Sequence, residues 1–131
     1  MVLKLTDDKP IYLQIKEYIE DSIMDDVMKA GERVPSTNEL AKHYQINPAT
    51  ARQGMNELVS ANILQIKRGV GMFVTDEAKG ILIEERQQTF YENYIIPMQK
   101  EAKKLQITNE QLYSMLKRKG NNIENKCAKY N

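Results

Sequence analysis

Residues 36–61 read STNELAKHYQINPATARQGMNELVSA and contain two predicted helices. Ser36 and Glu39 form a capping box, in which each side chain accepts a hydrogen bond from a free backbone amide, so the first helix begins here. Asn47 is a suitable N-cap and Pro48 a suitable first residue for the second helix, which fills the rest of the stretch. Two helices about three residues apart predict a helix-turn-helix.

A further helix is expected before this motif, over about residues 10–28. A branched apolar residue stands at every fourth position, which is a spacing typical of an amphipathic helix. These residues are Ile11, Ile15, Ile19, Ile23 and Val27. Pro10 suits the first turn of this helix.

A short hairpin is expected after the motif. Residues 63–67 and 72–74 are β-like runs, and the string Arg68-Gly69-Val70-Gly71 between them permits a tight turn. Three helices followed by a hairpin are the order of a winged helix-turn-helix. The predicted fold is therefore mainly α with a small β hairpin, and its N-terminal domain covers residues 1–75.

A second, helical section is expected over residues 76–118. Its apolar residues recur with a period close to seven along one long helix, which Pro97 is expected to kink. Thr108 and Gln111 form a second capping box that starts a last short helix. The polar tail, residues 119–131, is expected to be disordered.

This second section is too small to enclose a core of its own. Its apolar stripe must therefore pack on the first domain, on a second subunit or on both, and dimerisation is the simplest way to bury it. The expected dimer contacts are Ile83, Phe90, Tyr94, Met98 and Leu105. An alternative stays open, in which Tyr91 and Tyr94 line a pocket for a small-molecule effector of unknown identity.

Composition excludes several classes of protein. The chain has 131 residues, enough for one domain with a small appendage. One cysteine, Cys127, and one histidine, His43, exclude an internal disulfide and leave no Cys/His set for a metal. No nucleophile and base have a supporting spacing, and no glycine loop is placed to hold phosphate, so we expect neither an enzyme nor a cofactor. No run is apolar enough for a membrane span or a signal peptide, which predicts a cytoplasmic location.

The net charge of +1 does not indicate what the protein binds, but the distribution of charge along the chain does. Residues 42–71 carry a local charge of +3, because this range contains four basic residues and only one acidic residue. The basic residues are Lys42, Arg52, Lys67 and Arg68. A basic face on a nearly neutral protein is compatible with binding to nucleic acid.

Five separated strings resemble the GntR-type bacterial transcription regulators, over about residues 9–75. They are PIYLQI at 10–15, GERVPS at 31–36, ELA at 39–41, NPATAR at 47–52 and RGVGMFV at 68–74. The short helical section that follows, together with the Asn-Pro pair at residues 47–48, is similar to the YtrA subfamily.

The resemblance implies a homodimeric repressor whose winged helices bind successive major grooves of a double-stranded, inverted-repeat DNA operator. The subfamily points to a transporter operon as the target. Arg52 suits the reading of a guanine edge, the hydroxyls of Ser36 and Thr50 suit phosphates, and the wing turn suits the minor groove or the backbone. The expected DNA contacts are Ser36, Asn38, Asn47, Pro48, Ala49, Thr50, Arg52, Gln53, Arg68 and Gly69.

Three positions depart from the family pattern. Many relatives have arginine where Asn38 stands and some have it where Pro48 stands, so two phosphate contacts are lost or come from Lys42, Lys67 or Arg68. Gly54 stands inside the predicted recognition helix, where glycine costs about 1 kcal/mol relative to alanine, and close packing against another helix would explain it.

The missing cations leave open a second function, a winged helix that binds a protein partner without sequence-specific DNA binding. Binding that is insensitive to salt, or no binding to DNA at low salt, would favour this alternative.

Overall fold

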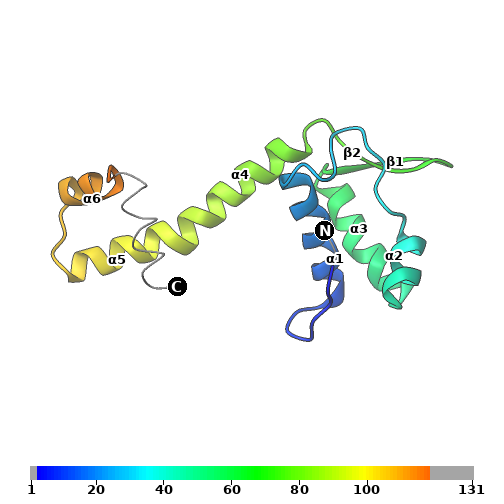
Figure 1. The fold of residues 1–131 in the computed structure, drawn as a ribbon, viewed down its shortest axis with the longest axis horizontal. Coiled ribbons are helices and arrows are strands. Elements are labelled where there is room, and N and C mark those ends of the chain that lie inside the picture. Colours follow the sequence, from blue (N-terminus) through cyan, green and yellow to red (C-terminus); the bar gives the residue numbers. More distant parts are fainter. Residues whose placement is uncertain (1–2, 119–131) are drawn as a thin grey trace. The chain divides into compact units, whose positions relative to one another are not determined.

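The computed structural model describes residues 3–118, and its elements follow the predicted order (Figure 1). The helices are α1 (Ile11–Met24), α2 (Thr37–Tyr44), α3 (Pro48–Ser60), α4 (Ala78–Phe90), α5 (Ile96–Lys104) and α6 (Asn109–Leu116), with a π-helical turn, η1 (Tyr91–Ile95), between α4 and α5. The strands are β1 (Leu64–Lys67) and β2 (Gly71–Val74), which form an antiparallel pair. The prediction of a mainly α fold with a small β hairpin is confirmed. The predicted disorder of residues 119–131 lies outside the described residues.

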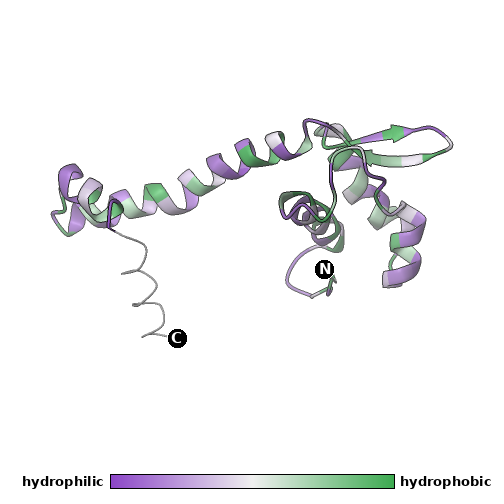
Figure 2. Cartoon of the chain, turned by 45° about the horizontal axis from the view of Figure 1, so that its top comes forward, coloured by the Kyte–Doolittle hydropathy of each residue, from purple (hydrophilic) through white to green (hydrophobic). Residues whose placement is uncertain are grey.

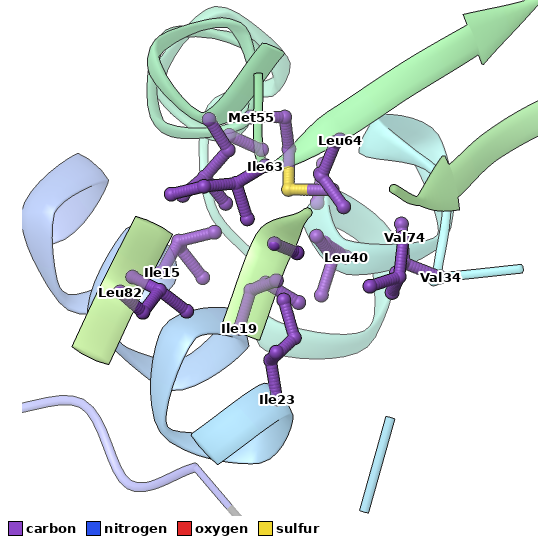
Figure 3. Packing of buried hydrophobic residues seen from close by; sticks show 14 residues of the cluster. Ile15, Ile19, Ile23, Val34, Leu40, Met55, Ile63, Leu64, Val74 and Leu82 are labelled. Carbon is purple, nitrogen blue, oxygen red and sulfur yellow. The ribbon is translucent and has the colours of Figure 1, made fainter. Parts of the chain in front are cut away.

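The hydrophobic core of the N-terminal unit gathers one face of each of the first three helices and the base of the hairpin (Figure 3). The predicted stripe of α1 supplies Ile15, Ile19 and Ile23, all of which are buried. Helix α2 contributes Leu40, and α3 contributes Met55 and Leu58. The base of the hairpin contributes Ile63, Leu64 and Val74.

Helix α3 crosses α1 closely at Gly54. A Cβ atom added to Gly54 would lie 2.6 Å from the backbone carbonyl oxygen of Tyr12. A side chain does not fit there, so the close packing suggested by the sequence accounts for this glycine.

Helix α1 ends earlier than predicted, and Val27 does not belong to its buried face. Asp26 adopts a left-handed conformation with φ 61°, and the N–H groups of Asp26 and Val27 bond to the carbonyls of Ile23 and Ser22 at 3.2 and 2.8 Å. This Schellman arrangement ends the helix at Met24 and leaves Val27 54% exposed. Aspartate tolerates the left-handed conformation better than most residues, so Asp26 is a suitable place for the helix to end. The periodicity of the apolar residues gives no information on this end.

A third chain segment pairs with β2, which the sequence did not predict. The N–H groups of Gly31 and Val34 donate to the carbonyls of Val74 and Met72 at 2.8 and 2.9 Å, and the N–H of Val74 donates to the carbonyl of Glu32 at 3.0 Å. The glycine and proline around this segment indicated a loop, because such residues usually break regular structure.

The N-terminal unit extends to Gln87, past the boundary at Thr75 that the sequence suggested. Ala78 and Leu82, in the first turns of α4, are fully buried in its core, and Figure 3 shows Leu82 beside Ile15. The first part of α4 therefore belongs to the winged helix.

The C-terminal unit begins at Gln88 and is described to Arg118. Only Ala102 is buried among these residues. Hydrophobic residues recur among hydrophilic ones along α4 and α5 (Figure 2). The predicted capping box is present, with Thr108 and Gln111 exchanging hydrogen bonds of 2.8 and 3.2 Å. Within residues 3–118, no helix combines the length and the apolar character needed to cross a membrane.

The helix is interrupted just before Pro97. In η1, the N–H of Ile96 bonds to the carbonyl of Tyr91, five residues back rather than four. Pro97 cannot donate a backbone hydrogen bond and its ring crowds the carbonyl of Asn93, so a wider turn accommodates it.

Candidate nucleic-acid interface

The start of α3 is fixed by the two residues that the sequence selected. The Oδ1 atom of Asn47 accepts a hydrogen bond of 2.8 Å from the N–H of Ala49, and Pro48 occupies the first helical position. Free N–H groups and the helix dipole give such a terminus a partial positive charge that favours a phosphate.

The buried face of α3 decides which side chains are available to a partner. Ala51, Gly54, Met55 and Leu58 are buried against the core. Pro48, Ala49, Arg52, Gln53 and Asn56 are therefore exposed, and Thr50 is half-buried. Four of the expected DNA contacts, Pro48, Ala49, Arg52 and Gln53, thus lie on the exposed face of α3.

A depression of about 410 Å³ lies between the hairpin and the helix-turn-helix, and we call it the wing groove. It brings together four of the predicted site residues, Ser36, Asn38, Arg52 and Gly69. Its other lining residues are Thr37, Ile66, Lys67, Val70, Gly71 and Met72. The remaining predicted residues, Asn47, Pro48, Ala49, Thr50, Gln53 and Arg68, do not line the groove.

The cations of the groove are available for an anionic partner. Arg52 makes no ion pair with any residue in the range 3–118. The Lys67 ammonium lies 4.5 Å from the centre of the Phe73 ring, a cation–π contact that holds it on the wing. The Arg52 guanidinium can therefore bind an incoming phosphate or guanine without first breaking an ion pair.

Ser36, which lines the groove, is one of the two residues of the predicted capping box of α2. The N–H of Glu39 donates to Oγ of Ser36 at 3.0 Å, and the N–H of Ser36 donates to Oε1 of Glu39 at 3.4 Å. Hydrogen bonds to the Glu39 carboxylate from the Ser36 side chain and from the Ser36 backbone N–H lower the pKa of Glu39, and Arg33 adds to the effect.

The apolar lining of the groove was not predicted. Ile66 and Met72 are directly opposite each other in the hairpin and so share one face of it, while Val70 is 60% exposed in the turn. Alternation along β1 and β2 would have placed Ile66 and Met72 together, but only the tertiary structure places them beside Arg52.

The wing turn has the geometry expected for its glycine. The N–H of Val70 donates to the carbonyl of Lys67 at 2.9 Å, and Gly69 adopts φ 76°. The positive φ of the turn is by itself a sufficient reason for glycine at this position. The presence of Gly69 therefore does not indicate a DNA contact.

Comparison with known proteins agrees with this fold. The family described as bacterial regulatory proteins, gntR family, matches residues 11–74. The HTH-type transcriptional repressor YtrA of Bacillus subtilis is 35% identical over 75 residues, which are 57% of this chain and 58% of YtrA. The uncharacterized regulator YhcF of the same organism is 28% identical over 109 residues, 83% of this chain and 88% of YhcF.

A solved structure extends the likeness over nearly the whole described chain. The GntR family transcriptional regulator from Listeria monocytogenes is 31% identical with a TM-score of 0.67, and the match covers 86% of this chain and 97% of that one. The chain therefore belongs to the gntR family of bacterial regulatory proteins and is a DNA-binding transcriptional regulator, not an enzyme.

Proposed function

We propose that this protein is a cytoplasmic, homodimeric repressor that binds an inverted-repeat DNA operator, with a transporter operon as its target. The exposed first turns of α3 carry the proposal, because Arg52 there shares the wing groove with Ser36 and Asn38. The name of YtrA, a transcriptional repressor, supports repression rather than activation.

In the proposed complex, α3 lies in the major groove and the wing contacts the neighbouring backbone or minor groove. Arg52 reads a guanine through two hydrogen bonds, and Gln53 reads a neighbouring base. The other contacts position the protein on the backbone: Ser36, Asn38, Asn47, Pro48, Ala49, Thr50, Arg68 and Gly69.

Dimerisation through residues 76–118 is supported by the exposure of their apolar side chains. Ile83, Phe90, Tyr94 and Leu105 of the predicted stripe are 39–65% exposed, and Met98 is partly exposed. Tyr91, Tyr113, Met115 and Leu116, which the sequence did not select, are also exposed. All of these residues except Ile83 belong to the C-terminal unit, which has almost no core of its own among the described residues, and such exposed apolar surface favours burial against a partner.

Selection of binding sites from random duplex DNA tests the proposal, followed by affinity measurements on the selected site at several salt concentrations. We expect an inverted repeat and a steep salt dependence, because each neutralised phosphate adds about one to the slope of log K against log salt. No enrichment and no binding at low salt would instead indicate a winged helix that binds a protein partner.

Arg52→Ala then tests the recognition helix, with Lys29→Ala as a control that removes the same charge from an exposed loop outside the groove. Arg52→Ala should lower discrimination between operator and scrambled DNA by about 1–3 kcal/mol, while the thermal unfolding temperature stays unchanged. A variant with full discrimination would show that α3 has been wrongly assigned.

A further inference from the structure

The backbone of Arg33 lies beside the wing, in the segment that pairs with β2. It forms an isolated β-bridge with Phe73, and its neighbour Val34 donates a backbone hydrogen bond of 2.9 Å to Met72. These contacts fix the backbone of Arg33 relative to the hairpin, so the direction of its side chain is set by the wing.

The Arg33 side chain lies against Gly71, over the position where a Cβ atom would stand. A Cβ atom on Gly71 would lie 2.7 Å from Nε of Arg33 and 3.4 Å from its Cδ. The space that a side chain at position 71 would need is therefore occupied by the arginine.

The far end of the same side chain reaches α2. Nη2 of Arg33 lies 3.3 Å from Oε1 of Glu39, the carboxylate that the capping box with Ser36 already holds in place. Gly71 and Ser36 both line the wing groove, Gly71 from the hairpin and Ser36 from the start of α2. Arg33 thus connects the hairpin with the start of α2.

We propose that Arg33, packed on Gly71 and paired with Glu39, is a positioning residue that holds the wing at a fixed distance from the helix-turn-helix and so sets the geometry of operator recognition. The inference rests on the proposed function, since the wing and α3 are taken to contact the same DNA. It assigns a role to a residue that the analysis of the sequence left out of the site.

An exposed arginine beside a DNA-binding groove has an obvious competing role, a direct contact with a phosphate. The two roles predict opposite effects for Glu39→Gln. Glutamine at this position keeps the capping box but loses the charge that pairs with Arg33. If Arg33 positions the wing, Glu39→Gln weakens operator binding. If Arg33 binds phosphate, Glu39→Gln frees it, removes a repelling carboxylate and strengthens binding.

The experiment compares the full chain with Arg33→Met, with Glu39→Gln and with the double variant, on the operator selected by the unmodified protein. We expect each single variant to lose about two- to fivefold in affinity, the range for an exposed ion pair, and the double variant to lose no more than either. The slope of log K against log salt should stay unchanged in all three. Arg68→Met is the control, because it removes the same charge from the wing turn without touching Arg33, and its effect should add to that of Glu39→Gln.

A second measurement does not depend on DNA. Hydrogen exchange at the amides of Val34 and Val74 should become faster in both single variants and stay unchanged in Arg68→Met, since the wing loses its connection to α2. Tighter binding by Glu39→Gln, additive losses in the double variant, or unchanged exchange would each overturn the proposal. If the unmodified protein selects no operator, the proposed function fails, and the exchange result still decides whether Arg33 holds the wing.

Discussion

Gly54 is where the packing of two helices depends on one missing side chain. Its Cβ position lies 2.6 Å from a backbone oxygen of α1, which cannot move aside as a flexible side chain would. Gly54→Ala should therefore destabilise the protein by about 1–3 kcal/mol despite the better helix propensity of alanine. Chemical denaturation measures this. Gly80→Ala in α4 is the control, because its Cβ would meet open space, and it should stabilise by about 0.5–1 kcal/mol. Equal effects at both sites would show that the helix crossing tolerates a methyl group.

Glu20 is an acidic side chain on α1 that is only 9% exposed. Burial raises its pKa, with nearby Glu85 adding to the effect and Lys16 opposing it. A raised pKa in the folded state means that the charged form costs stability at neutral pH, and this cost disappears as the pH falls below the ordinary range of glutamate, about 4.3. Glu20→Gln should therefore unfold at a higher temperature than the unmodified protein at pH 7, with the difference shrinking toward pH 4. Glu84→Gln, at an exposed position of α4, should show no such trend.

At the scale of the elements, local signals in the sequence were sufficient for most of the fold. Both capping boxes depend on residues three apart, so Ser36 with Glu39 and Thr108 with Gln111 could be identified without tertiary structure. The pairing of residues 31–34 with β2 could not, because it joins segments far apart in the chain and the signals around it indicate a loop.

The same distinction applies to the candidate site. The exposed face of α3 follows from helical periodicity, so the exposure of Arg52 can be predicted from the sequence. The wing groove forms only when the hairpin folds beside α2, so Ile66 and Met72 were missed. Arg33 was missed for the same reason, since Gly71 and Glu39 lie far apart in the sequence.

The element most open to adjustment is η1. Pro97→Ala restores a backbone donor to the residue after Ile96, so we expect the π turn to relax to an α-helix and the phase of α5 to change by roughly the 100° of one residue. If this turn sets the separation of the two recognition helices in the dimer, site selection with the variant should favour a different half-site spacing. Gln99→Ala, on the same helix, is the control. The same preferred spacing in all three proteins would refute a role for η1 in operator geometry.

At the scale of the whole molecule, residues 88–118 form helices with little to hold them together in a single chain. The rings of Phe90 and Tyr94 contact each other with their centres 5.2 Å apart and their planes tilted by 39°, yet the two residues remain 54% and 65% exposed. Short helices without a buried face are marginal in water, because nucleation is costly and packing supplies most of their stability. Their stability is therefore expected to depend on protein concentration, as it does for obligate dimers.

Replacing both rings, Phe90→Ser with Tyr94→Ser, tests this dependence. We expect sedimentation equilibrium to show a monomer, with the winged helix still folded because its core lies in residues 3–87. A monomer engages one half-site at a time, so its salt slope should fall to about half that of the dimer, and its operator affinity by about a hundredfold or more as the linked second contact is lost. Arg52→Ala should discriminate less between operator and scrambled DNA but stay dimeric, which separates assembly from recognition. A double variant that remains a dimer, or a monomer with full affinity and slope, would show that this stripe does not join the two subunits on DNA.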